Sequence, residues 1–389
     1  MNVCFFILGL TEHYKGGLEI YSENLIKSLS KRGIDVTVIT TALPNGIRFQ
    51  RKWGVNIYYA DGSPFKLDLR FIHSSMNIFK SLTRKKKIDI IHSQGIGGVG
   101  FTYHDVGKIP IILTMHGTAL NSFIGDVKAN PKSFMSLFKY IRLYENFEKP
   151  LVKIADKVIA VSSILKSDIV RQYLIDESKV TFIPAGVRNT NGTVQRNKAK
   201  KDDKVLVVSG GRLIRGKGFE DVVRLFYYLD NFEPSKFRFI IYGEGPLKSR
   251  LISLVKGLRM DKKIDFVGFI DNDSIHKFLL DGDIFVFMSK LKEGLPLSIS
   301  DAMSAGLVVF SLRTGGVVDL IRDGETGFII NSKNLKKTAL FIIEKIKNKK
   351  LLQVIGENAR KDILSKFTLE QMTKRHIKLY REILASFND

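Results

Sequence analysis

Short apolar runs alternate with amphipathic stretches along most of the 389-residue chain. The runs at 3–8, 205–209 and 284–288 are continuous and rich in β-branched or aromatic residues, which is typical of parallel strands buried on both faces. The segment 18–30 follows the first run and has apolar residues at helical spacing. This order of strand, glycine-bearing loop and helix predicts an α/β fold of doubly wound sheets. Further strands are expected at 36–40, 88–92, 111–115, 158–162, 180–183, 239–242, 264–269 and 307–310.

The length of the chain predicts two domains, because a single hydrophobic core stops growing at about 250–300 residues. Residues 189–203 are polar, rich in lysine and without hydrophobic periodicity, as in a linker. We therefore expect an N-terminal domain over 1–188 and a C-terminal domain over 204–367, joined by this linker. A final amphipathic helix is expected over about 368–389.

The stretch 283–330 carries the first candidate chemistry. Its buried strand is followed by a loop at 289–296 and a helix at 298–304. Glu293 and Asp301 are eight positions apart, so one lies in the loop and the other about a turn inside the helix. In open α/β sheets the carboxyl end of a strand faces the ligand crevice, and a helix N-terminus there attracts anions. The alternative is an ordinary turn with solvated acids.

A second glycine-bearing loop follows the strand at 205–209 and contains three cations ahead of the next helix. Arg212 and Lys217 are suited to bind a pyrophosphate, and the glycines between them let backbone N–H groups come close. The alternative is a basic loop that arose by chance.

The stretch 283–330 resembles the donor-sugar signature of the retaining GT-B glycosyltransferases of family 4, the glycosyl transferases group 1. That signature has a Glu, seven residues, a second Glu, then Ala-Met-Ala and a Gly-Gly turn. This chain has Glu293, seven residues, Asp301, then Ala302-Met303-Ser304 and Gly315-Gly316. Asp301 is one methylene shorter than the family's usual Glu. The resemblance implies two Rossmann-like doubly wound domains facing across a cleft, with the last helix packed back on the first domain.

The resemblance also implies roles for single residues. Glu293 would orient the donor sugar, and Asp301 would hold the ribose. Arg212 and Lys217 would stabilise the departing diphosphate, on which negative charge accumulates. His116, at the end of a predicted strand, would contact the sugar as a neutral imidazole. The other donor-binding positions that it implies are Gly16, Gly17, Gly211, Gly243, Gly268, Phe269, Gly294, Leu295, Pro296 and Leu297.

Two further motifs suggest other ligands, and we discount both. Residues 95–100 have G-x-G-x-x-G spacing, but the next strand ends in His116-Gly117-Thr118 and not in the acid that a dinucleotide site requires. We interpret this loop as cleft lining near the acceptor side. Residues 281–283 are Asp-Gly-Asp, but they precede their strand, so the acids belong at the end away from the ligand. We therefore expect neither a cofactor nor a metal.

The charge balance predicts anionic partners. Lys and Arg number 62 against 39 Asp and Glu, and the resulting net charge of +23 favours nucleotides, anionic lipid surfaces or nucleic acid. Segments 65–87 and 134–153 interleave apolar and basic residues, as helices that lie on a membrane surface do. The alternative is a core-facing helix with a solvated basic face. No recognisable nucleic-acid module accompanies these segments, so nucleic acid is not expected as a partner.

The expected location is cytoplasmic, with peripheral binding to the inner face of the membrane left open. No segment approaches ~18 uninterrupted apolar residues, so no transmembrane helix is expected. The single cysteine, Cys4, excludes an intrachain disulfide and suits a reducing compartment.

These observations together predict a retaining glycosyltransferase. It would move a hexose-type sugar from a UDP- or GDP-sugar to a saccharide or lipid-linked acceptor in cell-surface polysaccharide or glycolipid synthesis. Two alternatives stay open. One is a non-catalytic basic α/β protein that binds nucleic acid or anionic membrane, and the other is a nucleotide-sugar epimerase or hydrolase of similar fold.

Overall fold

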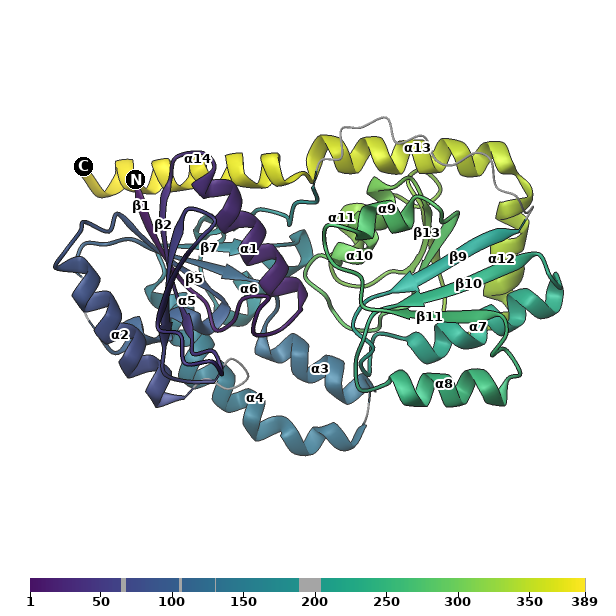
Figure 1. Ribbon diagram of the computed structural model, residues 1–389, viewed down its shortest axis with the longest axis horizontal. Helices are drawn as coiled ribbons and strands as arrows, with labels where there is room; N and C mark the ends of the chain where they lie inside the picture. Colours follow the sequence, from purple (N-terminus) through teal and green to yellow (C-terminus); the bar gives the residue numbers. More distant parts are fainter. Residues whose placement is uncertain (64–67, 105–106, 130, 189–203, 389) are drawn as a thin grey trace. The chain divides into compact units, whose positions relative to one another are not determined.

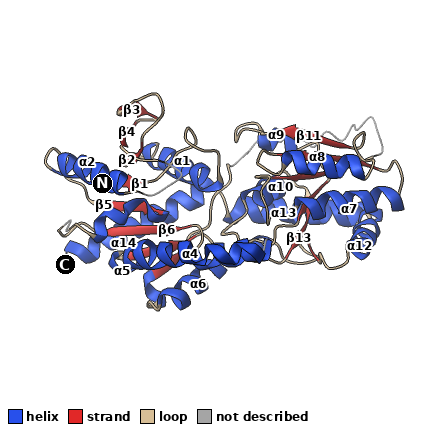
Figure 2. Cartoon of the chain, turned by 90° about the horizontal axis from the view of Figure 1, so that it is seen from below, coloured by secondary structure: helices blue, strands red, loops and turns tan. Residues whose placement is uncertain are grey.

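The computed structural model describes residues 1–63, 68–104, 107–129, 131–188 and 204–388. The predicted linker, 189–203, lies outside the described residues. The chain forms two compact α/β units, each with helices on either side of a sheet (Figures 1 and 2). The N-terminal unit comprises Met1–Phe123, Phe134–Gly186 and Leu369–Asp389, and the C-terminal unit comprises Ile124–Ser133 and Val187–Thr368.

The N-terminal unit has an eight-stranded sheet in the order β3-β4-β2-β1-β5-β6-β7-β8, in which only the β3–β4 pairing is antiparallel. Its strands are β1 (Asn2–Phe6), β2 (Asp35–Thr41), β3 (Phe49–Lys52), β4 (Val55–Ala60), β5 (Ile90–Gln94), β6 (Ile111–Met115), β7 (Lys157–Ala160) and β8 (Val180–Phe182). Its α-helices are α1 (Gly17–Ser30), α2 (Leu69–Thr83), α4 (Leu137–Leu143), α5 (Lys149–Ile154), α6 (Ser163–Tyr173) and α14 (Leu369–Asn388), and α3 (Ala119–Ala129) spans both units. Single turns and short 3₁₀ or π segments are η1 (Gly95–Thr102), η2 (Pro131–Ser136), η3 (Tyr144–Glu148) and η4 (Glu177–Lys179).

The C-terminal unit has a six-stranded, all-parallel sheet in the order β11-β10-β9-β12-β13-β14. Its strands are β9 (Val205–Gly210), β10 (Phe237–Tyr242), β11 (Ile264–Gly268), β12 (Ile284–Phe287), β13 (Val308–Leu312) and β14 (Phe328–Ile330). Its helices are α7 (Phe219–Phe232), α8 (Lys248–Gly257), α9 (Ile275–Leu279), α10 (Leu297–Ser304), α11 (Val317–Leu320), α12 (Leu335–Lys347) and α13 (Lys349–Lys366). The core between α7 and the sheet includes the stacked rings of Phe226 and Phe239, whose centroids are 4.5 Å apart.

The predicted strands all form, and the apolar runs explain why. Residues of β1, β5, β6 and β12 are buried almost throughout, as continuous apolar runs require in a sheet covered on both faces. The hairpin of β3 and β4 was not predicted. Its outer strand, Phe49–Lys52, is mostly polar and partly exposed at the sheet edge, so it lacks the signal of a buried strand.

The glycine-rich segment 95–100 has a packing role. It forms η1 after β5, and a Cβ on Gly97 would overlap the carbonyl oxygen of Phe6 in β1. A Cβ on Gly98 would lie 2.8 Å from the side chain of Ser93, and one on Gly100 would lie 2.8 Å from that of Met76. Close packing of η1 on β1 and α2 therefore accounts for the glycine spacing without a dinucleotide.

The two basic, amphipathic segments behave differently. Helix α2, in the segment 65–87, buries an apolar face, so the core-facing alternative is the correct one for the part of this segment that is described. That face consists of Phe71, Ile72, Met76, Phe79 and Leu82. Helix α4, in the segment 134–153, has no buried residue.

The last helix, α14, packs beside α1 in the N-terminal unit and inserts two polar side chains into a buried network (Figure 1). Tyr21 of α1 donates to His376 Nε2 (3.1 Å), while the Nδ1–H of His376 donates to the Met372 carbonyl (2.8 Å). The hydroxyl of Tyr380 lies 2.6 Å from Nδ1 of His92 in β5. Burial lowers the pKa of both histidines, to about 4 for His376, so both rings are neutral.

This network predicts an acid-sensitive N-terminal unit. An unfolded histidine gains a proton near pH 6.5, whereas the buried ring of His376 stays neutral down to about pH 4. Stability is therefore present above pH 6.5 and is lost as the pH falls toward 4, by about 2 kcal/mol at pH 5 from His376 alone. Urea unfolding at pH 7.5 and pH 5 should show a smaller acid loss for His376→Gln than for the wild type. His73→Gln, on the exposed side of α2, is the control, and an equal acid loss in all three proteins would contradict the account.

Candidate functional site

The strand order of the C-terminal unit fixes where a ligand can bind. The chain builds β9, β10 and β11 outward on one side and then returns to place β12 on the other side of β9. The loops that follow β9 and β12 therefore diverge at the carboxyl ends of these two strands and leave a crevice. This is the usual ligand position in open α/β sheets. These are the two loops in which the sequence predicted candidate chemistry.

Lys217 and Glu293 meet between these two loops. Lys217, in the loop after β9, donates from Nζ to Glu293 Oε2, in the loop after β12. The two side chains are only 13% and 17% exposed, so the pair is largely desolvated. Among the described atoms, Glu293 Oε1 is buried and has no hydrogen-bond partner. A buried carboxylate oxygen and a shared ammonium at a sheet's ligand crevice can exchange partners with a polar, anionic ligand.

Backbone contacts hold both loops in this arrangement. The N–H of Lys290 donates to the Gly216 carbonyl (2.8 Å), which joins the β12 loop to the β9 loop. The N–H of Gly316 donates to the Glu293 carbonyl (3.0 Å). Gly315 has a φ of +47°, and a Cβ there would overlap the backbone of Glu293. The Gly315-Gly316 turn therefore packs directly against the loop that carries Glu293.

Three predicted glycines converge beside this crevice. Gly211 follows β9, Gly243 follows β10, and Gly268 is the last residue of β11. All three have positive φ. The N–H of Gly243 donates to the Gly268 carbonyl (2.6 Å), and a Cβ on Gly243 would overlap the Gly211 carbonyl. Phe269, next to Gly268, is 42% exposed at the same edge. The three glycines leave the strand ends without side chains at these positions, so a flat ligand could approach the backbone closely.

The N-terminus of α10 faces the same crevice from the β12 side. Gly294, Leu295 and Pro296 lead into the helix, which begins at Leu297. The N-cap is Pro296, which has no side-chain acceptor for the N–H groups of the first turn. Those N–H groups and the helix dipole favour an anion.

Asp301 lies in the second turn of α10. Burial raises the pKa of Asp301 to about 7, although the positive charge of Arg188 opposes the shift. Near neutral pH, the carboxyl group is therefore present in both forms and can donate as well as accept a hydrogen bond.

The remaining predicted residues are separate from the Lys217–Glu293 pair. Arg212 lies in the β9 loop and is exposed. Gly16 is the N-cap of α1 and Gly17 its first residue, and His116 follows β6, so all three belong to the N-terminal unit. The structure describes each unit by itself.

His116 is held in one orientation. Its Nε2–H donates to Oε1 of Gln94 (3.2 Å), so Nδ1 remains as an acceptor. Its ring also meets that of Tyr21 edge to face, with 4.6 Å between centroids. Burial, reinforced by the neighbouring His376, lowers the pKa of His116 to about 3. The imidazole is therefore neutral at physiological pH.

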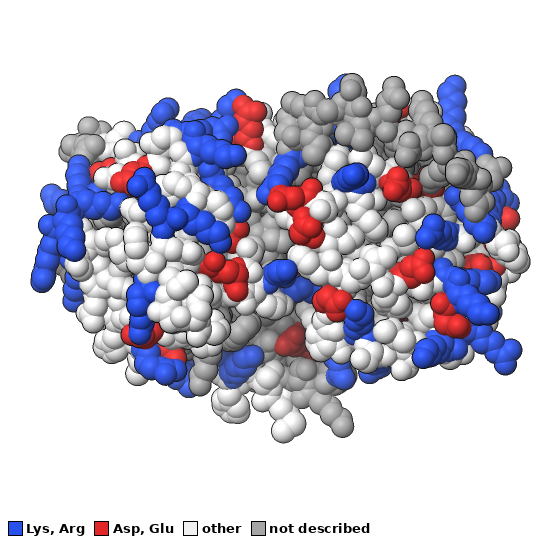
Figure 3. Space-filling view, viewed as in Figure 1, with Lys and Arg blue, Asp and Glu red and all other residues white. Residues whose placement is uncertain are grey.

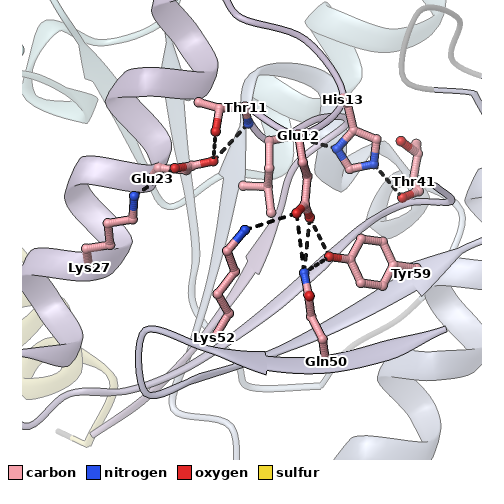
Figure 4. A network of polar contacts seen from close by, with 10 residues as sticks. Thr11, Glu12, His13, Glu23, Lys27, Thr41, Gln50, Lys52 and Tyr59 are labelled. Carbon is pink, nitrogen blue, oxygen red and sulfur yellow. Dashed lines mark hydrogen bonds and ion pairs between the residues drawn. The ribbon is translucent and has the colours of Figure 1, made fainter. Parts of the chain in front are cut away.

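A polar cluster around the β1–α1 loop was missed by the sequence analysis (Figure 4). Glu12 accepts hydrogen bonds from Tyr59 and from Lys52 (3.1 Å), and these outweigh burial, so the pKa of Glu12 falls below its usual value. His13 accepts from the Leu10 N–H (3.0 Å) and lies 2.8 Å from the Thr41 carbonyl. The cluster fixes this loop at the carboxyl end of the sheet. Its partners come from the unpredicted β3–β4 hairpin, which is why no local pattern showed it.

Asp283, from the Asp-Gly-Asp motif, has a structural role. Asp283 Oδ2 accepts from the Leu206 N–H (2.8 Å) at the amino end of β12, away from the crevice. Within the part of the chain that is described, no group of three or more His, Cys, Asp and Glu could hold a metal ion. On the face drawn in Figure 3, basic side chains spread over both units with acids scattered among them. No described helix is long and apolar enough to cross a bilayer.

The Lys217–Glu293 pair predicts a specific stability pattern. Lys217→Met should destabilise the C-terminal unit by about 1–3 kcal/mol, because it leaves a largely desolvated carboxylate without its cation. Glu293→Gln combined with Lys217→Met should cost less than the sum of the single changes. Urea unfolding of the four proteins measures the coupling, and strictly additive losses would show that the two side chains do not interact.

Two family models match the chain and together span most of it. The model for Glycosyltransferase Family 4 matches residues 15–190, and the model for Glycosyl transferases group 1 matches residues 192–362. The chain is 25% identical over 391 residues to N-acetyl-alpha-D-glucosaminyl L-malate synthase of Bacillus anthracis. The alignment covers 95% of this chain and 94% of the relative.

Solved structures of the same fold cover the whole chain. Sucrose-phosphate synthase from Thermosynechococcus elongatus superposes with a TM-score of 0.79 at 19% identity, over 99% of this chain and 100% of that one. Anabaena HepE in complex with UDP and glucose superposes with a TM-score of 0.74 at 17% identity, over 98% and 100%. Both sheets, the strand order and the two family matches agree, and the chain belongs to the family 4 glycosyltransferases, the glycosyl transferases group 1, with their GT-B fold of two Rossmann-like units.

Proposed function

We propose that this glycosyltransferase transfers a hexose-type sugar, with retention of anomeric configuration, from a UDP- or GDP-sugar to a saccharide or lipid-linked acceptor. The observation that carries the proposal is the largely desolvated Lys217–Glu293 pair at the topological switch point of the C-terminal unit. It places a cation and a carboxylate together where a nucleotide-binding sheet holds its ligand.

The donor's four parts, namely the diphosphate, ribose, base and sugar, have matching groups in the C-terminal unit. The diphosphate is bound by Lys217 and Arg212 and by the N–H groups at the start of α10. The ribose hydroxyls bond to Asp301. The base lies along the backbone at Gly268 and Phe269, where few side chains discriminate between bases. The sugar is then held beside Glu293.

Glu293 neutralises Lys217, and this shapes the mechanism. The ammonium of Lys217 is paired with the carboxylate of Glu293. When the diphosphate binds, the ammonium of Lys217 pairs with the phosphate oxygens. The carboxylate of Glu293 then accepts hydrogen bonds from the sugar hydroxyls. Lys217 then stabilises the negative charge that develops as the bond between the anomeric carbon and the phosphate oxygen breaks.

The transfer itself proceeds on one face of the sugar. The acceptor hydroxyl attacks the anomeric carbon from the side that the diphosphate leaves, and its proton passes to the departing phosphate oxygen. Glu293 as a covalent nucleophile is the weaker alternative, because in retaining glycosidases that route uses a second carboxylic acid at the reacting bond, whereas Asp301 is assigned here to the ribose. His116 does not serve as that acid, since its depressed pKa keeps the imidazole neutral, and we assign it a hydrogen bond to the sugar.

The names of similar proteins support this substrate class. The Bacillus anthracis relative is named N-acetyl-alpha-D-glucosaminyl L-malate synthase, and the Anabaena structure holds UDP and glucose. We place the reaction in cell-surface polysaccharide or glycolipid synthesis, in the cytoplasm or at the inner face of the membrane. Metal ions are not required, because Lys217, Arg212 and the α10 dipole neutralise the diphosphate.

Release of nucleoside diphosphate is the direct test. A panel of UDP-, GDP- and ADP-sugars with EDTA and with saccharide or lipid-linked acceptors should give acceptor-dependent release from one donor class. Glu293→Ala should lower this release by about 100-fold or more, since it removes an interaction made in the transition state. Glu344→Ala, an exposed carboxylate on α12, should keep full activity.

Other outcomes of the panel separate the alternatives. Release without any acceptor would favour a nucleotide-sugar hydrolase, and a changed sugar without release would favour an epimerase. Silence across the panel, with salt-dependent polyanion binding intact, would favour the non-catalytic basic protein.

The Gly315 turn offers a test of the loop geometry. Gly315→Ala should lower activity by about tenfold or more, because its Cβ overlaps the backbone of Glu293 and displaces the loop. Gly324→Ala is the matched control, since Gly324 also has positive φ (+76°) but has open space where the Cβ would lie. Both variants should lose about 1 kcal/mol of stability from backbone strain, and Gly315→Ala should lose more because its Cβ also overlaps the Glu293 backbone. Equal activity in the two variants would contradict the role given to the turn.

A further inference from the structure

Helix α4 presents an apolar surface that nothing in the described N-terminal unit covers. Met135 and Phe138 are 88% and 83% exposed, Phe134 is 59% exposed and Ile141 46%. Phe138 and Ile141 are three positions apart on one side of α4, and Phe134 and Met135 precede the helix in η2, so the four side chains lie close together along the chain. We call these four residues the α4 patch. Contiguous exposed side chains of this size mark an interaction surface more often than isolated ones do.

Aromatic contacts and a hydrogen bond anchor the helix to its unit. The rings of Tyr140 and Phe123 lie 5.6 Å apart between centroids, which ties α4 to α3. Phe134 also approaches Phe123, at 6.1 Å. Farther along, Tyr144 donates to the Gln172 carbonyl (2.6 Å). Helix α4, at the lower edge of the N-terminal unit in Figure 1, is therefore held in place by these contacts, while Met135, Phe138 and Ile141 remain exposed.

Cations flank the α4 patch and carry uncompensated charge. Lys139 and Arg142 are exposed on the same helix, and no ion pair between described residues involves either of them. The acid nearest in sequence, Glu145, is neutralised by Lys149 (2.8 Å). The ammonium of Lys139 also lies 5.4 Å from the centroid of the Tyr140 ring. The surface thus combines large apolar side chains with positive charges that no described carboxylate neutralises.

We infer that the α4 patch docks the N-terminal unit on an anionic lipid bilayer. Phe138 and Met135 enter the boundary between headgroups and acyl chains, while Lys139 and Arg142 meet lipid phosphates. Charge complementarity selects this occupant, because cations around exposed apolar side chains match a surface that is negative outside and apolar beneath. Helix α2 has a similar composition but buries its apolar face, so it does not contribute.

Docking would bring the enzyme to a lipid-linked acceptor in the membrane. In this respect alone the inference rests on the proposed function. The binding itself is independent of catalysis. Release of nucleoside diphosphate to a water-soluble acceptor should be unchanged by substitutions in the α4 patch, so loss of docking and loss of activity are separable.

Vesicle flotation tests the inference with the full-length protein. The wild type should bind vesicles of phosphatidylcholine mixed with phosphatidylglycerol and should bind pure phosphatidylcholine vesicles much more weakly. Phe138→Glu should weaken binding to the anionic vesicles by about tenfold or more, because it removes an inserted ring and adds a repelled charge. The double variant Lys139→Gln, Arg142→Gln should weaken it by about tenfold.

The matched control lies in the C-terminal unit. Leu340 of α12 is exposed and lies near Lys336 and Lys337. It therefore matches Phe138 as an exposed apolar residue near basic ones, but it does not belong to a larger apolar surface. Leu340→Glu should bind anionic vesicles as the wild type does. All these positions are exposed, and unchanged urea midpoints would verify that the variants are folded.

Three outcomes would overturn the inference. One is equal binding by Phe138→Glu and the wild type, and another is a wild type that binds neither kind of vesicle. The third is a different occupant of the α4 patch. A dimer in gel filtration that Phe138→Glu converts to a monomer would identify a second copy, and RNA binding that needs Lys139 and Arg142 but not Phe138 would identify a nucleic acid.

Discussion

One ion pair, between Lys217 and Glu293, joins the two loops that flank the switch point of the C-terminal sheet. Both side chains are largely removed from water. Separating them therefore costs free energy unless a ligand supplies new partners. The backbone bond from Lys290 to Gly216 and the close approach of Gly315 keep the loops where this pair can form. The donor site that we propose depends on this constraint, because the same cation that pairs with Glu293 is the one offered to the diphosphate.

The N-terminal unit follows a different principle, since its strand ends are tied together by neutral rings. His116 is oriented by Gln94 and touches Tyr21, which in turn donates to His376 on the last helix. The helix that the chain adds last therefore supports the residue that we assign to the sugar. The neutrality of these histidines is a consequence of burial, and it restricts His116 to hydrogen bonding.

The sequence predicted the strands well because buried parallel strands are continuous apolar runs, and it predicted both reactive loops because their glycines and charges are local. It did not predict that Lys217 pairs with Glu293, since that contact depends on β12 lying next to β9 across a crossover. His376 looked like one more residue on the apolar face of a helix, and only the packing of α14 on β5 and α1 shows its hydrogen bonds. Segments 65–87 and 134–153 have the same composition, and only the fold decides that α2 buries its apolar face and α4 does not.

The most direct test of the account is a crystal structure of the protein with a nucleoside diphosphate sugar. The account predicts that the Lys217–Glu293 bond opens, that Nζ of Lys217 lies within hydrogen-bond distance of a diphosphate oxygen, and that Glu293 contacts the sugar hydroxyls. A nucleotide bound elsewhere, with the Lys217–Glu293 pair still closed, would contradict it.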